Sequence, residues 1–126
     1  MGAYLWIAIG GALGSMGRYA TGIYVGRWLG TGFPWATLMI NVFGSFLIGA
    51  FAEAFALRWS TSQNVRVFLV VGICGGYTTF STFSLDIVTL INRDANLAAL
   101  AYIIASVILG LAALYAGLHT VRLALA

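Results

Sequence analysis

Four runs without a charged residue dominate the sequence, at positions 1–17, 28–52, 67–85 and 95–121. A helix needs about 20 apolar residues to cross the hydrocarbon core of a bilayer, and each run approaches or exceeds that length. Charged residues make up only 7% of the chain, against about 25% in a soluble domain. Such a chain cannot cover itself with a polar surface in water. We therefore predict an all-α integral membrane protein.

Short polar segments separate the runs and predict four transmembrane helices, near 3–28, 34–58, 64–91 and 96–122. Pro34 suits the first turn of the second helix. The connections are too short to hold a domain, so we expect residues 1–126 to form a single four-helix transmembrane domain. The first run has no positively charged segment ahead of it, and we expect a retained membrane helix rather than a signal peptide.

Four spans place both chain ends on one side of the membrane. That side would carry Arg58, Arg66 and Arg122, and the other side Arg27 and Arg93. The orientation of a membrane protein follows the asymmetry of its Lys and Arg residues, and here it is nearly absent. The chain therefore inserts either with a weak preference for an inside N-terminus or in both orientations. Insertion in both orientations would lead naturally to an antiparallel dimer.

The first predicted helix has small residues and one arginine at a spacing of four, and they share a face: Gly10, Gly14, Arg18, Gly22 and Gly26. Glycines at this spacing let membrane helices approach backbone to backbone. Arg18 is either an arginine that extends to the interface or a functional residue, since charges at membrane depth are costly. If it is functional, its positive charge favours an anion.

The second predicted helix has a polar stripe formed by Thr37, Asn41 and Ser45. An asparagine in the bilayer must find hydrogen-bond partners. Asn41 therefore has two open interpretations. It either fixes the packing of helices through an interhelical hydrogen bond, or its NH₂ group replaces water around a passing anion.

The third predicted helix contains the segment GGYTTFSTFS at positions 75–84. Two glycines weaken a helix, and Thr78 and Thr79 are β-branched residues that prefer other backbone shapes. We predict a break near 75–79, because unwound backbone is tolerated at membrane depth where protein buries it or a wet cavity adjoins it. The alternative is a continuous helix whose hydroxyls bond back to the preceding turn.

Aromatic and hydroxyl side chains follow this predicted break. Phe80 and Phe83 share a helical face, and the positive edges of their rings favour an anion, although ordinary core packing is the default interpretation. Together with the arginine and the polar stripes, a narrow path lined by hydrogen-bond donors is predicted. Its candidate residues are Arg18, Thr37, Asn41, Phe80, Ser81, Thr82, Phe83, Tyr102 and Ser106.

The chain has one histidine, one cysteine and three scattered acidic residues. These offer no metal-ligand cluster, no nucleophile with a base, and no cofactor motif. We therefore do not expect an enzyme. Cys74 cannot form a disulfide within the chain.

The whole chain resembles the Fluc fluoride channels, also called the CrcB family. The resemblance rests on its length, its four predicted spans and three motifs: GALGSMGRY at 11–19, NVFGSFLIG at 41–49 and GGYTTFSTFS at 75–84. It implies an antiparallel, dual-topology homodimer in the bacterial inner membrane. It also implies two pores that let fluoride leave the cell passively, which protects against fluoride toxicity, and a central structural sodium ion.

The resemblance also implies roles for individual residues. Asn41 would be the pore asparagine, Phe80 and Phe83 the two rings whose edges meet fluoride, and Arg18 the vestibule arginine. Backbone carbonyls of Gly75 and Thr78 would bind sodium, two from each chain. Four residues would belong to a polar track: Thr37, Thr82, Tyr102 and Ser106. At Gly110 the resemblance would lead us to expect one more hydroxyl, so the chain departs from the pattern there.

Other functions fit the residues less well. A small proton-coupled exporter of the multidrug resistance type would need a buried carboxylate in its first span, where this chain has Arg18 instead. A membrane subunit without transport activity would need no donor stripes. Between a channel and a coupled fluoride antiporter the residues do not decide, since none clearly carries a coupling proton.

Overall fold

The computed structural model describes residues 2–58 and 60–125, and all regular structure in these residues is helical. Three helices are continuous: α1 (Gly2–Leu29), α2 (Trp35–Leu57) and α6 (Asn96–Leu125). Between α2 and α6 lies an interrupted helical stretch. It consists of α3 (Gln63–Arg66), the π-helix η1 (Val67–Cys74), α4 (Gly75–Tyr77) and α5 (Phe80–Asn92).

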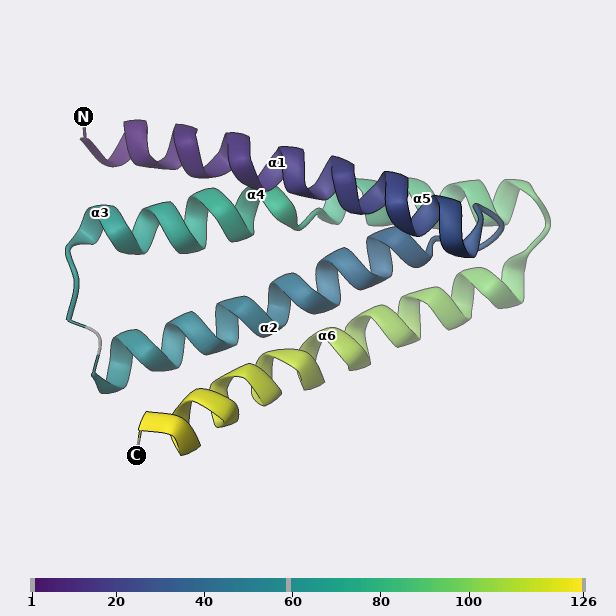
Figure 1. The fold of residues 1–126 in the computed structure, drawn as a ribbon. Coiled ribbons are helices and arrows are strands. Elements are labelled where there is room, and N and C mark those ends of the chain that lie inside the picture. The colour runs from purple at the N-terminus through teal and green to yellow at the C-terminus, as the bar shows by residue number, and fades with distance from the viewer. Residues whose placement is uncertain (1, 59, 126) are drawn as a thin grey trace.

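The helices run up and down beside one another, and both chain ends lie at the same end of the bundle (Figure 1). Three stretches are long and apolar enough to cross a membrane: Trp35–Leu57, Gln63–Asn92 and Asn96–Leu125. Helix α1 has 28 residues but does not meet the same criterion of apolarity. The structure therefore gives three candidate spans where the sequence predicts four.

Glycines set the distance between α2 and α6. A Cβ atom on Gly49 would overlap the backbone carbonyl of Leu114, and one on Gly117 would overlap the carbonyl of Phe46. The two helices therefore touch backbone to backbone, as small residues permit in membrane proteins. This contact fixes which residues of α2 face α6.

The glycine stripe of α1 divides into two halves. A Cβ on Gly10 would lie 2.6 Å from the carbonyl oxygen of Phe68, and one on Gly14 would lie 2.8 Å from the backbone nitrogen of Tyr77. For Gly22 and Gly26, no atom of the described residues apart from the nearby backbone of α1 itself lies within 4 Å of such a Cβ. The predicted packing stripe is confirmed for the first half, which seats η1 and α4 on α1.

Polar contacts join elements at both ends of the bundle. Near the chain ends, Nη2 and Nε of Arg122 lie 2.8 and 3.0 Å from the same carboxylate oxygen of Glu53. The Glu53 side chain is buried, so this ion pair ties α2 to α6. At the opposite end, Nη1 of Arg93 donates to the carbonyl of Thr31 over 3.5 Å and links the two connections there.

Candidate functional site

The interrupted helix is extended at two residues only. Thr78 has φ −81° and ψ 160°, and Thr79 has φ −155° and ψ 123°. The break therefore lies at the C-terminal end of the predicted segment, and Gly75 and Gly76 remain helical. Gly76 has a packing role instead, because a Cβ there would lie 2.7 Å from the carbonyl oxygen of Gly11 on α1.

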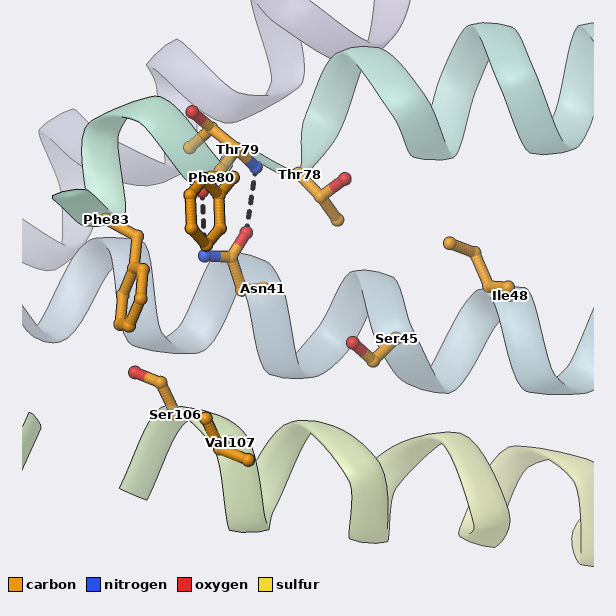
Figure 2. A pocket seen from close by; sticks show the side chains of 9 residues that line it. All are labelled: Asn41, Ser45, Ile48, Thr78, Thr79, Phe80, Phe83, Ser106 and Val107. Atoms are coloured by element: carbon orange, nitrogen blue, oxygen red, sulfur yellow. Dashed lines mark hydrogen bonds between the residues drawn. The ribbon is translucent and has the colours of Figure 1, made fainter. Parts of the chain in front are cut away.

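Asn41 of α2 holds the extended backbone through both ends of its side-chain amide. Its Oδ1 accepts a hydrogen bond from the backbone N–H of Thr79 at 2.8 Å, and its Nδ2 donates to the Thr79 carbonyl at 3.0 Å (Figure 2). The amide thus pairs with both backbone groups of a residue that has left the helix. An NH₂ group has two hydrogens, so one N–H donor of Asn41 remains beyond this pair.

Helix α1 holds the break from another side. Nε of Arg18 donates to the carbonyl of Gly76 at 3.1 Å, and the hydroxyls of Tyr77 and Thr21 lie 3.0 Å apart. Arg18 is therefore bonded to the interrupted helix.

Thr79 also begins α5. Its hydroxyl accepts a hydrogen bond from the backbone N–H of Thr82 at 3.1 Å, as an N-cap residue does. In a continuous helix, the N–H groups of Thr79 and Thr82 would donate to the carbonyls of Gly75 and Thr78, four residues earlier. Here they donate to the side chains of Asn41 and Thr79 instead. Among the described residues, no hydrogen bond reaches the carbonyl oxygens of Gly75, Tyr77 and Thr78.

A cavity of about 330 Å³ adjoins the break. It brings together four of the predicted path residues, Asn41, Phe80, Phe83 and Ser106, and none of the described residues that line it is charged. Figure 2 shows all of its lining residues, which are Asn41, Ser45, Ile48, Thr78, Thr79, Phe80, Phe83, Ser106 and Val107. The Ser106 hydroxyl is buried and has no hydrogen-bond partner among the described residues.

Aromatic rings form one wall of this cavity. The centroids of Phe80 and Phe83 lie 5.7 Å apart, and Phe80 is 78% exposed. Phe83 packs in turn against Tyr102 at 5.1 Å. Tyr102 is fully buried, and its hydroxyl donates to a carboxylate oxygen of Asp86 at 3.0 Å. Tyr102 therefore lies behind Phe83 and does not line the cavity.

The remaining predicted residues lie elsewhere. Arg18, Thr37 and Thr82 line a second cavity of about 320 Å³, which shares Thr79 with the first. Ser81 is among the lining residues of neither cavity, and its hydroxyl lies 3.3 Å from that of Thr79. Most of the predicted path residues thus line two separate cavities that have Thr79 in common.

Two polar residues that line the first cavity, Thr79 and Ser45, are not among the predicted path residues. Thr79 could have been recognised as an N-cap, because a threonine directly before a helical segment is the usual signal. Ser45 was placed on the polar stripe of the second helix but was not among the candidate path residues, although it lines the first cavity.

Comparison with known proteins places the chain in a family. The family model described as "CrcB-like protein, Camphor Resistance (CrcB)" matches residues 5–118. The chain belongs to the CrcB family. This result confirms the resemblance found in its motifs.

Curated CrcB relatives are similar to the chain over nearly its whole length. The Fluoride-specific ion channel FluC of Nitrobacter winogradskyi is 62% identical over 118 residues, 94% of each chain. Fluoride-specific ion channel FluC 1 of Nitrobacter hamburgensis is 61% identical over the same shares. FluC of Rhodospirillum centenum is 49% identical over 122 residues, 97% of each chain. These relatives are named as ion channels and not as enzymes. Because the chain belongs to this family and has several helices that can span a membrane, it is a multi-pass protein of the bacterial inner membrane.

Proposed function

We propose that this chain forms a fluoride-selective channel through which fluoride leaves the cell passively, so that the cell is protected against fluoride toxicity. The named relatives support the choice of ion. The observation that carries the proposal is the cavity beside the break, in which a spare amide donor, an unpartnered hydroxyl and two phenylalanine rings meet without a charged side chain.

This lining suits a small and strongly hydrated anion. Removing water from an ion is costly unless other groups replace it, and a conduction path must also release what it binds. The free N–H of Asn41 and the hydroxyl of Ser106 can donate to the ion, while the ring edges of Phe80 and Phe83 add positive potential. A fixed positive charge at this point would hold fluoride too tightly.

The second cavity would form the entrance to the path. Arg18 raises the local potential for an anion, and the hydroxyls of Thr37 and Thr82 offer further donors. We assign Tyr102 and Ser81 supporting positions next to the path, Tyr102 behind Phe83 and Ser81 beside Thr79.

A sodium ion at the break is part of the proposal. Hard cations take oxygen ligands, and the carbonyls of Gly75 and Thr78, which accept no hydrogen bond among the described residues, are suited to that role. When bound, sodium would balance the carbonyl dipoles that the break leaves unpaired. Asn41 and Arg18 would hold the neighbouring backbone in place for it.

Sodium is therefore expected to stabilise the folded protein. Purified protein in sodium chloride should melt at a higher temperature than in N-methyl-D-glucamine chloride of the same ionic strength, because an ion bound only to the folded state adds its binding free energy. Equal melting temperatures over a wide range of sodium concentrations would contradict the sodium site.

We further propose that α1 is the fourth span and that two chains associate antiparallel. Its 28 residues are long enough to cross a bilayer. Large apolar side chains of α1 are exposed in the single chain, among them Tyr4, Leu5 and Met16, and lipid or a second chain would cover them. The near balance of arginines at the two ends favours neither orientation.

Dual topology leads to a testable expectation in cells. A small epitope tag on either terminus should be accessible from both sides of the membrane, in two populations of similar size. Adding two lysines after residue 124 should shift the population toward a cytoplasmic C-terminus, since positive residues are retained inside. A tag found on one side only in the unmodified chain would contradict dual insertion.

The function itself is tested with purified protein in liposomes. Liposomes loaded with potassium fluoride should release fluoride rapidly when potassium can follow, and liposomes loaded with potassium chloride should release little chloride. Equal release of the two anions would contradict a fluoride-selective channel.

A further inference from the structure

We propose that Ser45 of α2 is a further residue of the ion path, and that it supplies the hydroxyl that α6 lacks at Gly110. This inference deepens the proposed function and rests on it. It assigns to Ser45 direct contact with the permeating anion one helical turn beyond Asn41.

Two stripes face each other across the α2–α6 contact. On α2, Asn41 and Ser45 are four residues apart and share a face, and both line the first cavity. On α6, Tyr102, Ser106 and Gly110 have the same spacing, so that a phenol and a hydroxyl are followed by a position without a side chain.

The close contact between α2 and α6 places Ser45, the last residue of the α2 stripe, opposite Gly110 of the α6 stripe. Because Gly49 and Gly117 let the two backbones touch, the register of the helices is fixed there. A Cβ built on Gly110 would lie 3.7 Å from Oγ of Ser45. The Ser45 hydroxyl is thus next to the place where a hydroxyl on residue 110 would be.

The hydrogen bonding of Ser45 points to a ligand as well. A hydroxyl in a helix commonly bonds to the carbonyl four residues earlier, as Thr21, Ser84 and Thr120 do at 2.9, 3.1 and 2.7 Å. In the part of the chain that the structure describes, no side-chain hydrogen bond involves Ser45, and the buried hydroxyl of Ser106 has no hydrogen-bond partner. Both residues line the cavity (Figure 2). Ser45 is half-buried, so we expect its hydroxyl to be available to an ion there.

The test compares fluoride release from liposomes for four proteins: the unmodified chain, Ser45→Ala, Gly110→Ser, and the double variant. Hydrogen bonds to charged groups are among the stronger ones in proteins, so Ser45→Ala is expected to slow release at least about tenfold. Gly110→Ser alone should leave the rate near that of the unmodified chain. The double variant should recover most of the lost rate, because it returns a hydroxyl to the same place from the opposite helix.

Thr120→Ala provides the matched control, since it removes an exposed hydroxyl of α6 that is already bonded to the Ala116 carbonyl. Its rate should not change. An unchanged rate in Ser45→Ala would overturn the inference, and so would a double variant as slow as Ser45→Ala, because the loss would then come from packing. Either result is distinct from failure of the proposed function, in which the unmodified chain itself would release no fluoride.

Discussion

Replacing Asn41 with aspartate is expected to slow fluoride release from liposomes at least a hundredfold. Asn41 donates from Nδ2 to the Thr79 carbonyl and accepts from the Thr79 N–H at Oδ1. Aspartate keeps the acceptor but loses both N–H donors, and its carboxylate faces a carbonyl and the path of an anion. Two like charges about 4 Å apart repel by about 4 kcal/mol at an effective dielectric constant of about 20, and every 1.4 kcal/mol is about tenfold.

The control for this variant is Asn96→Asp. It makes the same chemical change at an exposed residue at the start of α6, and its release rate should match that of the unmodified chain. Both variants should elute at the same volume from a gel-filtration column, which separates loss of conduction from loss of folding. Release by Asn41→Asp at the unmodified rate would remove Asn41 from the path.

The second large effect concerns folding. Gly49→Ala is expected to abolish the stable protein or to lower its melting temperature strongly. The added methyl group would overlap the backbone carbonyl of Leu114, and a backbone cannot move away as a flexible side chain can. Overpacking of a close contact costs about 1–3 kcal/mol and occasionally more, and here both helices would have to separate over their length.

Gly110→Ala is the matched control for the glycine prediction. It adds the same methyl group at the same helix contact, but the nearest atom, Oγ of Ser45, would lie at an ordinary distance of 3.7 Å. Its melting temperature in detergent should stay close to that of the unmodified chain. If Gly49→Ala melts at the same temperature as Gly110→Ala, then the α2–α6 contact is looser than the structure indicates.

Much of the fold follows from local features of the sequence. The expected helices near 3–28, 34–58, 64–91 and 96–122 correspond to the observed stretches Gly2–Leu29, Trp35–Leu57, 63–92 and Asn96–Leu125, because polar and turn-forming residues separate apolar runs. The break was also predictable in its region, since β-branched threonines follow two glycines. Its position at Thr78 and Thr79, rather than at the glycines, goes with contacts to two other helices: Gly76 packs closely against α1, and Asn41 of α2 pairs with the backbone of Thr79.

Contacts between distant residues could not be read from the sequence. The pair Glu53–Arg122 joins residues 69 positions apart, and the hydrogen bond from Tyr102 to Asp86 removes Tyr102 from the cavity surface. Periodicity shows which residues share a face of one helix, but it does not show which helix that face meets. For the same reason, the predicted single row of donors is divided into two cavities in the structure.

Fluoride efflux from potassium-loaded liposomes, measured with a fluoride electrode with and without valinomycin, tests the central claim most directly. A passive channel moves charge, so without valinomycin the separated charge should stop release within the first moments. Once valinomycin lets potassium follow, release should proceed rapidly. The rate should track the potassium gradient and should not depend on a proton gradient. Release that is indifferent to valinomycin and driven by a proton gradient would contradict a channel and would indicate a coupled exporter.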